Sequence, residues 1–113
     1  MIMKEKLKNV EVTLKGNVYF DGRVTSRTFY KESGERFTLG IITPGSYTFD
    51  VGDKEIVKML QGTAQICLPG ESEFHEVTEG ETFIIPTNCN YQIRTYGIVE
   101  YMCDYVVERQ VEL

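Results

Sequence analysis

The segment from Gly45 to Pro86 carries acidic side chains whose types and spacing suit them for chemistry. Asp50 and Glu55 lie five residues apart, and the one histidine of the chain is His75. Zinc and similar transition metals prefer imidazole or thiolate ligands, usually three or four of them. A single histidine cannot form a facial histidine cluster, and Asp50 with Glu55 makes a poor transition-metal site. These residues therefore predict a chemistry that uses no metal.

The remaining reactive side chains give weaker signals. Cys67, Cys89 and Cys103 contain no Cys-x-x-Cys pair, so reduced thiols in a cytoplasmic protein are the simplest interpretation. Cys67 and Cys103 lie in apolar runs, where a free cysteine acts as a small hydrophobic residue. Cys89 is the cysteine we expect to be exposed, but no nearby base or cation marks it as a nucleophile. His75 has the pKa range of a general acid or base, although an exposed strand histidine is the simpler interpretation.

Size and charge bound the possible functions. A chain of 113 residues forms one domain with one core, and 42% hydrophobic with 26% charged residues is typical of a globular protein. No apolar run approaches the roughly 18 residues of a membrane span, and no apolar run follows the basic segment 1–8 as in a secretory signal. The net charge of −5 argues against a nucleic-acid partner but permits a small anion in a local cationic pocket.

Short strands must position these side chains. Runs of β-branched and aromatic residues alternate with turn signals such as Pro44-Gly45 and Pro69-Gly70. This pattern predicts an all-β sandwich or barrel rather than alternating strands and helices. The expected strands are 10–14, 22–30, 37–42, 47–50, 56–60, 64–68, 74–77, 82–85, 91–96 and 99–107.

One strand alternates clearly enough to separate its two faces. Tyr91 and Ile93 are bulky, whereas Gln92 and Arg94 between them are polar and must point the other way. The pattern leaves open whether Gln92 and Arg94 face solvent or line a polar pocket.

The spacing of glycines around Glu55 resembles that of the cupin superfamily. Six residues separate Glu55 from Gly62, and five residues separate Gly80 from Pro86. The resemblance implies a single-domain cupin, a jelly-roll β-barrel or sandwich, in which Glu55 points into the barrel. A buried carboxylate without a metal needs another partner, or it becomes protonated.

The positions of the cupin metal ligands differ in this chain. Metal-binding cupins would carry histidines near positions 48, 50 and 91, where this chain has Thr48, Asp50 and Tyr91. The resemblance is therefore to a cupin that works without a metal.

A further set of motifs extends through nearly the whole chain, from about Asn17 to Val106. They are Tyr19-Phe20-x-Gly22-x-Val24, Gly40, Gly45-x-Tyr47-Thr48-Phe49, Glu55, Leu68-Pro69, Gly80-x-x-Phe83-x-x-Pro86 and Tyr101-x-Cys103-x-Tyr105. In order and spacing they resemble the pyrimidine/purine nucleoside phosphorylases, a family of small metal-free cupins. The resemblance implies a cytoplasmic homodimer without a cofactor. It implies a glycosyltransferase that cleaves ribonucleosides with inorganic phosphate as co-substrate, giving the free base and ribose 1-phosphate.

Three features lie outside or depart from this resemblance. Residues 1–16 form an N-terminal extension, expected to be a strand or arm, and 108–113 form a tail beyond the cupin domain at 17–107. Asp104 stands where relatives can carry arginine. If that arginine helps to hold phosphate in the relatives, this chain has an acid in its place.

Phosphorolysis assigns roles to particular residues. Its transition state resembles the oxocarbenium ion of glycoside hydrolysis, with phosphate in place of water. Glu55 is expected to hydrogen-bond ribose hydroxyls or offset the developing positive charge. Arg36 and Arg94 are candidates for holding phosphate, because a guanidinium fork matches phosphate oxygens. We predict Glu55 and Arg36 as catalytic residues, and as substrate-binding residues Tyr47, Thr48, Phe49, Asp50, Tyr91 and Arg94.

Plainer interpretations remain open for each of these residues. Glu55 would then form a structural salt bridge, the arginines would be solvated strand-edge charges, and the aromatic residues would pack in the core. For the whole protein, two alternatives to phosphorolysis remain. One is a non-catalytic cupin that binds a nucleoside or another small metabolite, and the other is a metal-dependent isomerase or oxygenase.

Overall fold

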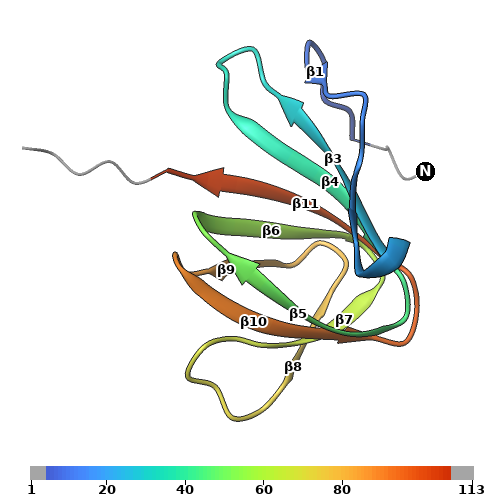
Figure 1. Cartoon of the computed structure of the whole chain (residues 1–113), viewed down its shortest axis with the longest axis vertical. Helices are drawn as coiled ribbons and strands as arrows, with labels where there is room; N and C mark the ends of the chain where they lie inside the picture. Colours follow the sequence, from blue (N-terminus) through green and yellow to red (C-terminus); the bar gives the residue numbers. More distant parts are fainter. Residues whose placement is uncertain (1–4, 108–113) are drawn as a thin grey trace, which may run out of the picture.

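The computed structural model describes residues 5–107, which form two antiparallel sheets that enclose one core (Figure 1). The larger sheet contains, in spatial order, β1 (Glu11–Val12), β3 (Val24–Tyr30), β4 (Arg36–Ile42), β11 (Val99–Val106), β6 (Lys54–Gln61) and β9 (Thr82–Ile85). A further short strand, β2 (Asn17–Tyr19), also pairs with β3. The smaller sheet has the order β5 (Gly45–Val51), β10 (Cys89–Thr95), β7 (Thr63–Cys67) and β8 (His75–Thr78). The all-β prediction is confirmed.

All ten expected strands are present, and their ends agree with the prediction to within two residues. The prediction missed β2, whose three residues are too few to show an alternating pattern. The Asn17 side chain in β2 donates hydrogen bonds to the Ser26 and Thr28 hydroxyls of β3. Of the expected N-terminal extension, residues 5–16 contain β1 at the edge of the larger sheet, whereas residues 1–4 and the tail 108–113 lie outside the described residues.

The core forms where the inward-facing positions of the two sheets meet. In β10, Tyr91, Ile93 and Thr95 are buried, and in β5, Tyr47 and Val51 are buried. Strand β11 lies between β4 and β6 in the centre of the larger sheet (Figure 1). Because side chains alternate between the two faces of a strand, each inward position is followed by an outward one.

A left-handed turn closes one end of the sandwich. Phe20, Asp21 and Gly22 have φ angles of 52°, 55° and 89°, which is rare for residues with a side chain. The turn places the Phe20 ring 5.0 Å from Tyr47 and 5.5 Å from Phe49, measured between centroids. These contacts hold the β2–β3 hairpin against β5.

The part of the chain that the structure describes contains no helix long and apolar enough to cross a membrane.

Candidate functional site

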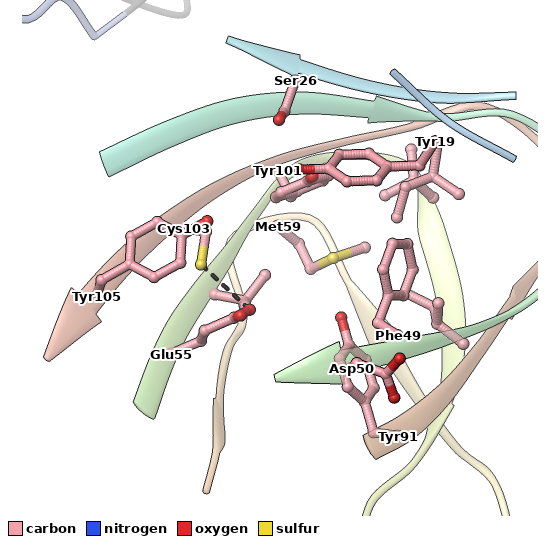
Figure 2. Close-up of a pocket in the computed structure, with 14 residues that line it drawn as sticks. Tyr19, Ser26, Phe49, Asp50, Glu55, Met59, Tyr91, Tyr101, Cys103 and Tyr105 are labelled. Carbon is pink, nitrogen blue, oxygen red and sulfur yellow. Dashed lines mark hydrogen bonds between the residues drawn. The ribbon is translucent and has the colours of Figure 1, made fainter. Parts of the chain in front are cut away.

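A cavity of about 120 Å³ lies between the two sheets and is lined by inward-facing side chains of both (Figure 2). A cavity of roughly 150 Å³ holds one benzene molecule, so this one accommodates a single small ring or its equivalent. Its lining combines aliphatic side chains with many polar groups. The polar groups belong to Tyr19, Ser26, Asp50, Glu55, Tyr91, Tyr101, Cys103 and Tyr105.

Glu55 points into this cavity from the start of β6. It lies directly opposite Tyr105 of β11 and Ile85 of β9. The Cys103 thiol donates a hydrogen bond to Glu55 Oε1 at 3.4 Å (Figure 2). Burial raises the pKa of Glu55 above the ordinary carboxyl value, while the Cys103 hydrogen bond and the Arg36 charge partly offset this effect. Among residues 5–107, Glu55 forms no salt bridge, so the structural ion-pair interpretation fails for the described part of the chain.

Arg36 lies beside the cavity at the start of β4. Its guanidinium carbon is 3.9 Å from the centroid of the Tyr105 ring, and its side chain is exposed. The Tyr105 hydroxyl is in turn 3.1 Å from the hydroxyl of Thr38 on the same strand as Arg36. The structure therefore brings the two predicted catalytic residues, Glu55 and Arg36, to the same tyrosine from the two strands that flank β11.

Two of the predicted aromatic residues form one wall of the cavity. The rings of Phe49 and Tyr91 are stacked, with centroids 5.7 Å apart and planes inclined by 24°. Burial and the nearby Glu55 charge raise the pKa of Tyr91, which keeps its phenol protonated and able to donate a hydrogen bond. Tyr47 is buried outside the cavity lining, and its hydroxyl donates to the Thr43 carbonyl at 2.8 Å. Tyr47 therefore packs in the core.

Thr48 and Arg94 do not reach the cavity. They lie on the outer face of the smaller sheet, because they alternate with the inward residues of β5 and β10. Arg94 Nε donates to Gln65 Oε1 at 2.6 Å, and its guanidinium carbon lies 3.9 Å from the centroid of the Phe74 ring. The structure therefore does not bring Thr48 and Arg94 together with the predicted site residues that line the cavity.

The two aspartates of interest differ in position. Asp50 is exposed and lies at the rim of the cavity, close to Tyr91 in the view of Figure 2. Asp104 does not line the cavity, and its carboxylate pairs with Lys31 Nζ at 3.2 Å. An acid at position 104 therefore leaves the cavity lining unchanged.

The sequence prediction gave no catalytic or binding role to Tyr101, Cys103 and Tyr105, which line the cavity side by side on β11. Their spacing of two was visible in the sequence and places all three on one face of a strand. Gly40 on β4 makes room for this face, because a side chain there would overlap the ring of Tyr101. The pairing of β11 with β4, which no local pattern reveals, turns this face toward the cavity.

The other candidate side chains lie outside the cavity. His75 is exposed, with Nδ1 3.5 Å from Glu71 Oε1. Cys67 and Cys89 are both half-buried, so Cys89 is less exposed than expected. The third cysteine, Cys103, differs from these because it is buried and lines the cavity. Within residues 5–107, no three His, Cys, Asp or Glu side chains lie close enough together to hold a metal ion.

Comparison with known sequences gives a consistent result. Residues 14–105 match the family model described as pyrimidine/purine nucleoside phosphorylase. A curated relative with that name from Clostridioides difficile (strain 630) is 41% identical over 103 residues, covering 91% of this chain and 98% of its own length. One from Syntrophotalea carbinolica is 40% identical over 101 residues, covering 89% of this chain and 97% of its own.

Solved structures give the same fold. A crystal structure of a protein of unknown function (DUF1255) from Acinetobacter sp. ADP1 superposes with a TM-score of 0.87 at 29% identity, covering 89% of this chain and 98% of that one. A cupin-2 domain containing protein from Shewanella frigidimarina superposes with a TM-score of 0.57 at 19% identity, covering 69% and 76% of the two chains. The second similarity concerns the fold alone, and it confirms the predicted cupin architecture.

Proposed function

The chain belongs to the pyrimidine/purine nucleoside phosphorylase family, and we propose that it cleaves purine and pyrimidine ribonucleosides with inorganic phosphate. The bond between ribose C1′ and the base nitrogen breaks, and its electron pair leaves with the base, which takes up a proton. A phosphate oxygen forms the new bond to C1′, giving ribose 1-phosphate. The observation that supports this proposal best is the carboxyl of Glu55, half-buried in an aromatic-lined cavity with Arg36 beside it.

Glu55 and Arg36 have complementary tasks in this reaction. Positive charge develops on the ribose in the transition state, and an ionised Glu55 in a partly desolvated site stabilises that charge. The Glu55 carboxylate would repel phosphate, so the anion needs a cation outside the cavity. Arg36 provides one, since its guanidinium is exposed and fixed against the Tyr105 ring.

The size of the cavity constrains how a nucleoside binds. Pockets that enclose a whole drug-sized ligand usually measure about 300–1,000 Å³, well above the 120 Å³ found here. We infer that one part of the nucleoside enters the cavity and the remainder lies at the rim, near Asp50. A base held mainly by stacking on aromatic rings such as Phe49 and Tyr91 is poorly discriminated, which supports activity on both purines and pyrimidines.

We further propose a cytoplasmic homodimer that needs no metal or other cofactor. The three free cysteines support a reducing compartment. Ile41 and Leu60, both exposed at the edge of an open groove on the larger sheet, support association of two copies. Light scattering after size exclusion tests this, because a mass of one chain at all concentrations contradicts it.

The decisive experiment measures release of free base from adenosine, inosine, uridine and cytidine, with and without phosphate. We expect phosphate-dependent release that is largely lost in Glu55→Gln and kept in Arg94→Ala, the control on the outer face. No release from any of the four nucleosides would refute the proposal. Thermal stabilisation by nucleosides without turnover would instead favour the non-catalytic binding protein.

A further inference from the structure

We propose that Cys103 is a positioning residue for this reaction, its thiol holding the carboxylate of Glu55 in place against the sugar. The inference rests on the proposed function, because it assigns Cys103 a role only through Glu55. The thiol itself touches neither substrate nor phosphate in this scheme.

The contact between the two side chains is built by neighbouring strands. Cys103 lies in the middle of β11, opposite Val57 of β6, which is two residues from Glu55. Its side chain is 1% exposed, and its sulfur lies 3.4 Å from Glu55 Oε1. The other acceptor near the sulfur, the Asp104 carbonyl oxygen, is farther away at 3.8 Å.

Cys103 is the one side chain that hydrogen-bonds Glu55 among the described residues. The other charged or titratable groups around the carboxylate are Arg36 on β4, Tyr101 and Tyr105 on β11, and Cys89 and Tyr91 on β10. The Tyr105 hydroxyl is already paired with Thr38 on β4. A glutamate has several rotatable bonds, so without Cys103 its carboxylate would sample more orientations in the cavity.

The same surroundings exclude a nucleophilic role for this cysteine. Burial and the adjacent Glu55 charge raise the pKa of the Cys103 thiol well above its ordinary value. The sulfur therefore stays protonated and acts as a hydrogen-bond donor toward the carboxylate.

The kinetic test compares Cys103→Ala, which removes the donor, with Cys103→Ser, which keeps one. We expect kcat to fall about tenfold in the alanine variant, the effect of losing one hydrogen bond to a charged group, and to recover in the serine variant. KM for phosphate should stay nearly constant, because Arg36 is untouched. The acid limb of the pH profile should move to higher pH in the alanine variant, since a hydrogen bond to the ionised carboxyl lowers its pKa. Cys67→Ala, at a half-buried cysteine outside the cavity, is the matched control.

The rates of a double variant distinguish a positioning role of Cys103 from a general structural role. The double variant Cys103→Ala/Glu55→Gln should be no slower than Glu55→Gln alone, because Cys103 acts only through Glu55. Additive losses, or a serine variant as slow as the alanine variant, would overturn the proposal.

A spectroscopic test needs no turnover and observes the native thiol directly. The infrared S–H stretching band of Cys103, assigned by its absence in Cys103→Ser, should shift when Glu55 is replaced by alanine. A band that does not respond would overturn the inference, whatever the activity. If the wild-type protein cleaves no nucleoside but the band does respond, the proposed function fails and the contact between Cys103 and Glu55 is still supported.

Discussion

The position of Glu55 in the cavity lowers the stability of the folded protein when its carboxyl is ionised. Its pKa is raised by burial, so the folded protein binds more protons than the unfolded chain at pH values between the ordinary and the raised pKa. In that window the free energy of unfolding falls as pH rises, because the native state must then hold a desolvated charge. This is the pattern expected of a functional residue whose charge is used rather than neutralised by an ion pair.

We predict that Glu55→Gln is more stable than the wild type at neutral pH, while it is nearly inactive. Glutamine keeps the shape and an acceptor for Cys103 but cannot ionise. The difference in Tm between variant and wild type should grow as pH rises through the raised pKa of Glu55. Thermal unfolding of both proteins at acidic and neutral pH measures this, and a difference that shrinks with rising pH contradicts it.

Arg36 should affect both phosphate binding and the ionisation of Glu55. In Arg36→Ala, we expect KM for phosphate to rise about tenfold or more, consistent with the loss of a charged hydrogen bond. The pKa of Glu55 should also rise, because the Arg36 charge lowers it, so the acid limb of kcat/KM should move to higher pH. In Arg36→Lys, the acid limb of kcat/KM should return close to its wild-type pH, because lysine supplies the charge. The KM for phosphate should recover less, because lysine lacks the planar fork of the guanidinium. An unchanged KM in Arg36→Ala would place the phosphate elsewhere.

At the scale of the strand, alternation decides which side chains reach the cavity. The sequence showed that Gln92 and Arg94 share one face of their strand, but not that this face is the outer one. That assignment depends on how β10 packs against the other sheet, which is a property of the whole fold. Arg36 and Arg94 were therefore both candidates for holding phosphate in the sequence, and of the two only Arg36 lies near Glu55.

The close packing of the Tyr101 ring against Gly40 gives a prediction for β4. In Gly40→Ala, the new methyl group would overlap the Tyr101 ring and push it toward the cavity. We expect a loss of about 1–3 kcal/mol in unfolding free energy, as for overpacked cores, and a marked loss of activity. Gly97→Ala is the matched control, because no atoms lie near its added methyl group. Equal stability of the two variants in urea unfolding would contradict the close contact.

How much the sequence revealed varies along the chain. The strands were predictable because β-branched and aromatic runs end at strong turn signals, and Glu55 followed from the cupin spacing. The contacts of Cys103 with Glu55 and of Tyr105 with Thr38 were not predictable, since they form between strands that are far apart in sequence. The turn at Phe20 was also hidden, because its left-handed backbone contradicts the ordinary preference of phenylalanine.

At the scale of the whole molecule, the donor set of the cavity predicts that activity needs no metal. Within residues 5–107 the acidic and sulfur side chains do not converge in the groups of three that would hold an ion. We expect the rate of phosphorolysis to be unchanged after dialysis against EDTA. A loss of activity that returns on adding a divalent metal, with metal bound in proportion to protein, would refute this prediction.

The central position of β11 also determines at which stage of synthesis and folding the cavity can form. This strand is the last of the described chain, yet it is inserted between β4 and β6 and supplies Cys103 and Tyr105 (Figure 1). Its partners lie tens of residues earlier, and long-range pairing of this kind is slow to form. During synthesis, the edges of β4 and β6 that pair with β11 therefore stay unpaired until the C-terminal segment leaves the ribosome. The nascent chain has no assembled cavity before that moment, and a chain interrupted before residue 99 would expose one unpaired edge on β4 and one on β6, both prone to aggregation.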